Sequence, residues 1–507
     1  MTHRPLTREH VRVAIVGTGF SGLGMAIRLR QQGEDFVLLE RADDIGGTWR
    51  DNTYPGCRCD VPSHLYSFSF APNPNWSSTF SPQSEILDYL KDCAERFGVM
   101  QHIRFNTEVE GAAWDDDGQV WRIETSNGPL TANFLVAAQG PLSEPSLPEV
   151  PGIDSFEGTA FHSAQWDHGH DLTGERVAVI GTGASAIQFV PEIQPKVGQL
   201  HVFQRTAPWV IPHRNRPLKN WERTLYRLFP PAQLAMRAAI YWARELFVLQ
   251  FRHRAVGKLL ERIPLTHLRR QVKDPELRRK LTPGYAMGCK RILPTDEWYP
   301  ALTKPNVEVV TEGITEVRSR SVVAADGSER EVDTIIFGTG FHVTDVPIAD
   351  RITGRDGRTL EEVWAGSMHG YKGTTVAGYP NLFFLVGPNT GLGHTSIVFM
   401  IESQIAYVLD ALHTVRRRGA HTLEVREDAQ SAYNADLDRM TNDTVWVTGG
   451  CTSYYIDRNG HNSALWPTFT WPFRRRLREF DAAAYVLGAR VPARNGDRDP
   501  LGAAAHA

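Results

Sequence analysis

Two glycine-rich turns, each between an apolar strand and an apolar helix, constrain this chain more than any other feature. The first follows the apolar run Val11 to Val16 and reads Gly17-Thr18-Gly19-Phe20-Ser21-Gly22. In such a GxGxxG turn the glycines permit a tight bend and a close backbone approach, and the helix N-terminus offers N–H donors to a pyrophosphate. Glu40 ends the next apolar strand, where a carboxylate can bind the ribose of an adenosine. The sequence therefore predicts a dinucleotide site formed by Gly17, Gly19, Phe20, Ser21, Gly22 and Glu40.

The second turn, after the strand 176–180, predicts a different nucleotide. It has alanine in place of the third glycine, which this type of turn allows. Its next strand ends at Arg205, followed by Thr206, where the first unit has an acid. A guanidinium binds a 2′-phosphate that a carboxylate would repel, which favours NADP over NAD. The alternative is that Arg205 is only a solvated cation at a strand end. The residues of the turn are Gly181, Thr182, Gly183, Ala184 and Ser185.

A third segment favours FAD at the first site. Gly46-Gly47-Thr48-Trp49 follows Glu40 after a short loop. Its glycines let the backbone approach a bulky ring system, and Trp49 can cover such a ring. The apolar run 333–337, which ends in Gly338-Thr339-Gly340-Phe341, suits the return of the chain from the second nucleotide unit to the first, or is simply a core strand.

The length of 507 residues is too great for one core, so we expect several domains. The predicted fold class is α/β, with two Rossmann-like domains and a helical insertion. The predicted boundaries are 1–148 and 343–490 for the FAD domain, 149–215 and 284–342 for the NADP domain, 216–283 for the insertion, and 491–507 for a disordered tail. The insertion is expected to cap the NADP domain near the substrate entrance; a helix on a membrane surface is the alternative.

Charge and cysteine content exclude several classes of protein. There are 55 Lys and Arg against 58 Asp and Glu, so no basic excess indicates a nucleic-acid partner. Five cysteines are too few for a disulfide scaffold, and Cys57-Arg58-Cys59 has neither redox nor zinc-site spacing, so no metal is expected. A reducing, cytoplasmic setting follows. We find no run of about 18 apolar residues and no signal peptide, so stable membrane insertion is not expected.

The segment 155–167 reads as a linker, because it follows several prolines and has no helical or strand periodicity. Yet it carries Phe156, Gly158, His162, Trp166 and Asp167. These residues resemble the sequence fingerprint of the type I Baeyer–Villiger monooxygenases, a branch of the class B flavoprotein monooxygenases. That fingerprint is FxGxxxHxxxW followed by Pro or Asp. The resemblance extends to the two glycine turns, to Gly-Gly-Thr-Trp, to the segment 54–60 and to Gly-Thr-Gly-Phe. In that family the segment links the FAD and NADP domains, which implies that His162 helps to set their orientation.

The resemblance implies an activity and a set of site residues. NADPH would reduce FAD, and O₂ would then form a C4a-peroxyflavin that converts a ketone into an ester or lactone. Arg291 matches the catalytic arginine, Asp60 its carboxylate partner, and Lys290 a 2′-phosphate ligand beside Arg205 and Thr206. Further residues expected at FAD are Gly47, Thr48, Trp49, Tyr66, Val109 and Ile397, the last at the start of a helix, and further residues expected at NADP are Arg58 and Gln188. The loop 387–396 would shape the ketone pocket, and the aromatic segment 446–471 either closes over the site or only packs.

Three other functions remain open at this stage. A sulfur or nitrogen oxygenase is the nearest, although Trp166, Asp167 and Arg291 argue against it. A pyridine nucleotide–disulfide reductase would need a CxxC or CxxxxC pair, which this sequence lacks. A regulatory protein that senses NADPH without turnover would not retain a flavin. The ketone, its selectivity and the oligomeric state are not predicted.

Overall fold

The computed structural model describes residues 9–489, and their fold is the predicted α/β class with two parallel-stranded nucleotide-binding units. The larger sheet has the order β17-β4-β5-β6-β1-β2-β3, and β18 also pairs with β6. β1 runs parallel to both β2 and β6 at its centre, which is why its side chains are buried on both faces. Its strands are β1 His10–Val16, β2 Phe36–Leu39, β3 Ile103–Arg104, β4 Val109–Asp115, β5 Val120–Thr125, β6 Leu130–Ala137, β17 Ile352–Thr353 and β18 Leu382–Phe384.

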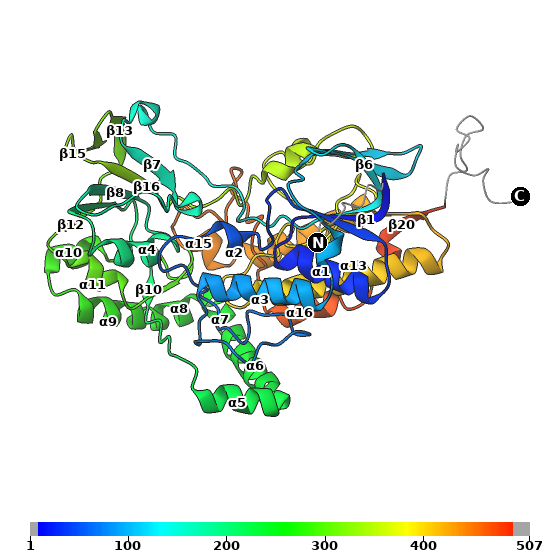
Figure 1. Cartoon of the computed structure of the whole chain (residues 1–507), viewed down its shortest axis with the longest axis horizontal. Helices are drawn as coiled ribbons and strands as arrows, with labels where there is room; N and C mark the ends of the chain where they lie inside the picture. Colours follow the sequence, from blue (N-terminus) through cyan, green and yellow to red (C-terminus); the bar gives the residue numbers. More distant parts are fainter. Residues whose placement is uncertain (1–8, 490–507) are drawn as a thin grey trace, which may run out of the picture.

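Long helices cover one face of this sheet. α1 (Phe20–Gln31) begins inside the first glycine turn and packs on α13 (Ile397–Arg417) and α3 (Gln83–Arg96), which lie together in Figure 1. α13 begins at Ile397 as predicted, and the Ser396 hydroxyl caps it by accepting from the Val398 N–H. Nearly all of α1 is buried, so the first turn rests on a rigid support. The short helix α2 (Thr48–Asp51) carries Trp49 at the edge of this unit.

The second sheet is parallel throughout, in the order β12-β9-β8-β16-β7. Its strands are β7 Thr159–His162, β8 Arg176–Ile180, β9 Gln199–Phe203, β12 Val307–Val310 and β16 Thr334–Phe337. α4 (Ala186–Ile193) starts within the second glycine turn, and α11 (Trp298–Leu302) packs on it. A small antiparallel sheet, β13 Ile314–Arg318, β14 Ser321–Ala324 and β15 Glu329–Glu331, stands at its outer end (Figure 1).

The predicted linker 155–167 is partly wrong. Residues 159–162 form β7, the edge strand of the second sheet, in register with β16. Gly158 makes this pairing possible, because a Cβ there would lie 2.2 Å from the Asp333 carbonyl oxygen. Two short 3₁₀ turns, η2 (Ile153–Ser155) and η3 (Ser163–Gln165), flank the strand. Of the fingerprint residues, His162 therefore belongs to a sheet strand, and the others lie in the turns and loops that flank it.

The insertion is helical as expected, but its helices divide between the two units. α9 (Arg262–Gln271) and α10 (Pro275–Lys280) lie on the second unit, where the Gln204 amide donates to the Lys280 carbonyl. α6 (Pro230–Glu245) instead docks on the first unit: Arg237 donates to the His64 carbonyl and Tyr241 contacts Thr470. The insertion therefore contacts both units, whereas the prediction placed it on the NADP unit. The other helices of the insertion are α5 Asn220–Leu228, α7 Val248–Arg252 and α8 Arg254–Leu260; α5 and α6 project from the body in Figure 1.

The remaining elements complete the first unit and the seam between the units. β10 (Val210–Ile211) and β11 (Leu293–Pro294) pair in parallel, and β19 (Thr422–Val425) pairs with β20 (Tyr485–Gly488). The other helices are η1 Met100–His102, η4 Pro347–Arg351, α12 Leu360–Trp364, α14 Glu427–Thr441, α15 Val445–Thr448, α16 Thr470–Arg476 and η5 Ala482–Ala484. Between residues 9 and 489, no helix combines the length and apolarity needed to cross a bilayer. The predicted tail 491–507 lies outside the described residues.

The cysteine prediction also needs correction. Cys289 and Cys451 form a disulfide across 162 residues, with Cα atoms 6.2 Å apart. The chain has only five cysteines, and these two are far apart in the sequence, so no sequence pattern indicated that they pair. Cys57, Cys59 and Cys93 are buried free thiols.

Candidate active site

The first glycine turn is held by contacts that only glycine allows. Gly17 has φ +98°, and a Cβ on Gly22 would lie 1.8 Å from the Gly17 carbonyl oxygen. Gly47 also has positive φ, and its Cβ would meet the Gly19 Cα at 3.2 Å, so the Gly-Gly-Thr-Trp segment lies directly against the turn. The Gly46 N–H donates to the Thr18 carbonyl. Two sequence motifs thus form one backbone cradle at the carboxyl end of β1.

Glu40 closes this cradle. Its carboxylate accepts from the Thr18 hydroxyl at 2.5 Å and from the Thr18 N–H at 3.1 Å. Arg50 approaches the other oxygen at 2.8 Å. Burial lowers and its acidic partners raise the pKa of Arg50, and the net shift is upward. The predicted ribose-binding acid is therefore held at the edge of the turn by hydrogen bonds and a salt bridge.

A cavity of about 610 Å³ runs from this cradle to the second glycine turn. Its volume lies in the usual range for ligand sites. It is lined by most of the predicted residues: Gly17, Gly19, Phe20, Ser21, Glu40, Gly47, Thr48, Trp49, Arg58, Asp60, Tyr66, Val109, Gly183, Ala184, Ser185, Gln188, Arg291 and Ile397. Gly22, Gly181, Thr182, Arg205, Thr206 and Lys290 are not in its lining. Residues predicted at the two nucleotide sites thus line the two ends of one continuous cavity.

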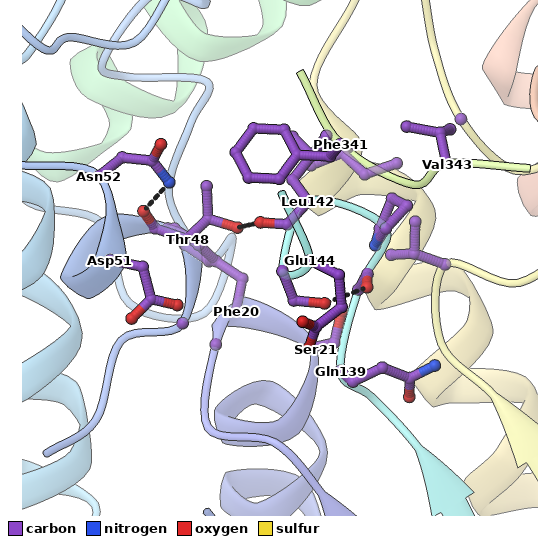
Figure 2. A pocket seen from close by; sticks show the side chains of 18 of the residues that line it. Phe20, Ser21, Thr48, Asp51, Asn52, Gln139, Leu142, Glu144, Phe341 and Val343 are labelled. Carbon is purple, nitrogen blue, oxygen red and sulfur yellow. Dashed lines mark hydrogen bonds between the residues drawn. The ribbon is translucent and has the colours of Figure 1, made fainter. Parts of the chain in front are cut away.

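Figure 2 shows part of the cavity wall near the first turn. Thr48 lies between Asn52, which donates to its carbonyl at 2.9 Å, and Leu142, whose carbonyl is 3.5 Å from the Thr48 hydroxyl. Phe20 and Ser21 lie on α1, and Phe341 belongs to the returning segment. Gln139 also lines the cavity, and within the described residues its buried Oε1 has no hydrogen-bond partner. A glycine cradle, a fixed acid and an unused amide oxygen fit a dinucleotide with a hydrogen-bonding ring system.

Arg291 and Asp60 meet between the two turns. The Arg291 Nε and Nη2 each donate to one Asp60 carboxylate oxygen at 2.7 Å, a bidentate pair. Its Nη1 lies 3.5 Å from the Leu392 carbonyl of the loop 387–396. Arg291 comes from the second unit, just before β11, whereas Asp60 comes from the first. The pair therefore spans the seam between the units.

The electrostatics keep both members of this pair charged. Burial would raise the pKa of the Asp60 carboxyl, but Arg291, Arg244 and His213 lower it below its ordinary value. The Asp60 carboxylate in turn raises the pKa of Arg291 well above its usual range. A permanently protonated guanidinium at the cavity wall can stabilise an anion formed beside it.

The second turn is also shaped by close backbone contact. Gly181 has φ +109°, and a Cβ there would lie 2.4 Å from the Gly338 carbonyl oxygen. At the end of β9, the Lys290 amine donates to the Thr206 hydroxyl at 2.6 Å. Burial and the charge of Arg205 lower the pKa of Lys290. Arg205, whose side chain is exposed, and Lys290 thus form a positive cluster where the sequence predicts a 2′-phosphate.

Gln188 joins α4 to the loop of the first unit that precedes Asp60. Its amide oxygen accepts from the Tyr54 hydroxyl at 3.1 Å and from the Arg58 N–H at 3.2 Å, and its amide nitrogen donates to the Arg58 carbonyl. The two units are thus joined beside the cavity by backbone-directed hydrogen bonds.

The fingerprint residues lie behind the cavity. His162 is buried at the end of β7, its Nδ1 accepts from the Ala164 N–H, and its ring lies edge-on to Phe341 at 5.7 Å. Burial lowers the pKa of His162 to about 4. Trp166 packs on Phe161 and Phe189. Asp167 caps the following turn by accepting from the Gly169 N–H.

Sequence reasoning missed several residues around the Arg291–Asp60 pair. Arg244, at the end of α6, donates to the Asp60 carbonyl at 2.9 Å. Tyr454 and Tyr455 line the cavity with Arg291, their hydroxyls 3.0 Å apart. Gln139 lies two residues after the end of β6. Of these residues, only Tyr454 and Tyr455 had a sequence signal, which was the high aromatic content of 446–471. Arg244 could not be singled out because the insertion contains many other arginines.

Two facing glycine turns and a charged pair between them define an oxidoreductase of the two-dinucleotide flavoprotein class. A family model described as flavin-binding monooxygenase-like matches residues 10–231. A Baeyer–Villiger monooxygenase of Streptomyces coelicolor is 52% identical over 98% of this chain and 96% of its own length. The chain belongs to the Baeyer–Villiger monooxygenases within the flavin-binding monooxygenase family.

Solved structures agree with this assignment. Cyclohexanone monooxygenase from Rhodococcus sp. Phi1 bound to NADP⁺ superposes with a TM-score of 0.85 at 28% identity, covering 96% of this chain and 100% of that one. OTEMO in complex with FAD and NADP superposes with a TM-score of 0.84 at 28% identity, covering 94% and 99%. The predicted family and fold class are confirmed.

Proposed function

We propose that this FAD- and NADP-dependent Baeyer–Villiger monooxygenase oxygenates a ketone to an ester or lactone, with Arg291 and Asp60 as its central pair. The observation that carries the proposal is the bidentate contact between these two side chains at the wall of the shared cavity. FAD, when bound, supplies hydride acceptance and oxygen activation. The first cradle, from Gly17 to Glu40 with Gly47, Thr48 and Trp49, would hold it. The cluster Arg205, Thr206 and Lys290 would hold the NADPH 2′-phosphate.

In this proposal the protein contributes charge, orientation and water exclusion. Arg291 keeps its proton at any working pH and stabilises negative charge on oxygen beside it. Asp60 fixes the plane of the guanidinium through two hydrogen bonds, and Arg244 holds the backbone of Asp60. Tyr66, which accepts from the Trp49 indole at 3.1 Å, also lines the cavity. The proposal includes a cytoplasmic location, which cell fractionation would test.

The decisive experiment compares Arg291→Ala with Arg291→Lys in the flavin-loaded enzyme. We expect alanine to reduce ester formation about 100- to 1000-fold, as for loss of one preorganised electrostatic donor, with flavin content unchanged. Lysine keeps the charge but loses the bidentate geometry, so it should fall between alanine and the wild type. Product analysis with a ketone panel, NADPH and O₂ gives the rates. Wild-type ester yield in Arg291→Ala would refute the proposed role.

A sulfide or amine oxygenase is the runner-up. The same product analysis with sulfides and tertiary amines separates the two activities. Sulfoxide or N-oxide formation with no ester from any ketone would replace the ketone proposal.

A further inference from the structure

We propose that Cys289 and Cys451 form a redox-reversible modification site, which takes thiol reductants and peroxide and sets how firmly residues 449–466 cover Arg291. Residues 449–466 form the cover loop. Cys289 is two positions before Arg291, and Cys451 lies near the start of the cover loop. The disulfide thus joins the segment that supplies the arginine to the loop beside the same cavity. Its consequence for turnover rests on the proposed function; its chemistry does not.

Both ends of the cover loop are attached to the walls of the site. At the far end, Asn389 and Gly391 donate backbone hydrogen bonds to Ser463 and Ala464, and Trp466 donates back to Gly391. At the near end, the Ala286 N–H donates to the Gly449 carbonyl at 3.0 Å. The disulfide is the covalent part of this near attachment. Reduction therefore leaves the far end held, whereas the near end keeps only the Ala286–Gly449 hydrogen bond and is loosened.

The disulfide lies in a small hydrophobic cluster of its own, separate from the main core. That cluster contains Phe251, Trp446 and Tyr455 around the fully buried Cys289. The chain passes so close that a Cβ on Gly449 would lie 2.8 Å from the Cys289 sulfur. Displacement of this cluster reaches the active site directly, because Tyr455 and its neighbour Tyr454 line the cavity with Arg291.

Exposure selects which sulfur reacts. Cys451 is half-buried, whereas Cys289 is completely buried. A thiolate of a small dithiol attacks the Cys451 sulfur, and Cys289 leaves and takes a proton from solvent. The second thiol of the reductant then attacks the mixed disulfide, which releases Cys451 and the cyclic oxidised reductant. In the opposite direction, two thiols and one hydrogen peroxide give the disulfide and two waters, so both directions balance.

The other three cysteines are poorly suited to this chemistry. Burial raises the pKa of Cys57 to about 12 and that of Cys93 to about 11, and it also raises the pKa of Cys59. Few of these thiols are ionised near neutral pH, and the thiolate is the reactive form. Reversible oxidation is therefore directed to Cys289 and Cys451.

The consequence for turnover is a change in coupling. A cover loop attached at both ends excludes water from the site, whereas one loosened at its near end admits it. We expect the reduced enzyme to release about fivefold more hydrogen peroxide per NADPH consumed than the disulfide form, in the presence of a ketone. Trypsin should also cleave the reduced form faster at Arg458, which is an exposed arginine of the cover loop.

The experiment prepares the flavin-loaded enzyme with dithiothreitol or with hydrogen peroxide and counts thiols after denaturation. The disulfide form should show three free thiols and the reduced form five, of the five cysteines in the sequence. Cys451→Ser should show the reduced-form peroxide yield and cleavage under both conditions. The matched control Cys93→Ala, which changes a cysteine of α3, should keep the full redox response.

Two results would overturn the inference. Five free thiols after peroxide treatment would show that the pair does not form, whatever the activity. If the oxidised form shows three thiols and the reduced form five, but both forms have the same cleavage rate and peroxide yield, the disulfide does not control the cover loop. An enzyme that consumes no NADPH with any ketone would contradict the proposed function, while thiol count and cleavage would still decide the modification site. If Cys451→Ser fails to fold, the wild-type comparison alone gives these outcomes.

Discussion

At the scale of single residues, we expect Arg205 to determine the preference for NADPH over NADH. Arg205 is exposed at the end of β9, beside the Lys290–Thr206 contact, and no residue of this cluster lines the main cavity. Arg205→Ala should raise the KM for NADPH about 10- to 100-fold, the usual value of a hydrogen bond to a charged group, and leave the KM for NADH nearly unchanged. Steady-state kinetics with both nucleotides measures this ratio. Arg318→Ala, on the β13 strand of the same unit, should change neither KM; an equal rise for both nucleotides in Arg205→Ala would exclude a 2′-phosphate contact.

Asp60 offers a second prediction for a single residue. Asp60→Asn keeps the shape but removes the charge that raises the pKa of Arg291 and fixes its plane. We expect slower flavin reduction by NADPH and slower ester formation, each by about tenfold or more, because the guanidinium loses its charged partner and Arg244 and Arg291 are left uncompensated. Rapid mixing resolves the two half-reactions. If both rates match the wild type, Asp60 does not position Arg291.

At the scale of elements, β7 is the most informative strand, because its edge position depends on one glycine. Gly158→Ala should lower the free energy of unfolding by about 1–3 kcal/mol, since its Cβ would overlap the Asp333 carbonyl and the Phe156 ring. Gly313→Ala is the control, because a Cβ there meets nothing within 4 Å. Chemical denaturation of both variants checks the difference. Equal stabilities would mean that β7 can shift away from β16 at little cost.

The same element shows what sequence reasoning can and cannot reach. β1, β2, β8 and the starts of α1 and α4 were predictable, because buried parallel strands are continuous apolar runs and the glycine turns fix where these two helices begin. β7 was not, because Thr159 to His162 is short, mixed in polarity, and pairs with a strand far along the chain. The disulfide and the Arg244 contact also depend on long-range packing, which local patterns do not encode. The Arg291–Asp60 pair came from resemblance alone, since a Lys-Arg dipeptide is usually surface charge.

The stability of the whole molecule should depend on buried histidines. Burial lowers the pKa of His162 and of His64 to about 4 in the folded protein, whereas an unfolded histidine has a pKa of about 6.5. Between these values the unfolded chain binds more protons, so the free energy of unfolding falls as pH drops from 6.5 to 4. His162→Gln should reduce this slope by up to about 1 kcal/mol per pH unit, and the exposed His461→Gln should not. Urea unfolding of the flavin-loaded protein at several pH values gives the slopes. The same slope in His162→Gln and the wild type would mean that His162 has the same pKa in the folded and unfolded states.

The connecting segments 144–146 and 340–342, which lead into and out of the second nucleotide unit, pair with each other. The Ser146 N–H donates to the Gly340 carbonyl and the His342 N–H to the Glu144 carbonyl, so the outgoing and returning segments form a short antiparallel ribbon. His162 lies against this ribbon through Phe341. A single strand would act as a flexible tether with freedom in every direction, whereas a paired ribbon bends most easily about one line. Bending about the ribbon therefore preserves its hydrogen bonds, whereas sliding or twisting one segment past the other strains them.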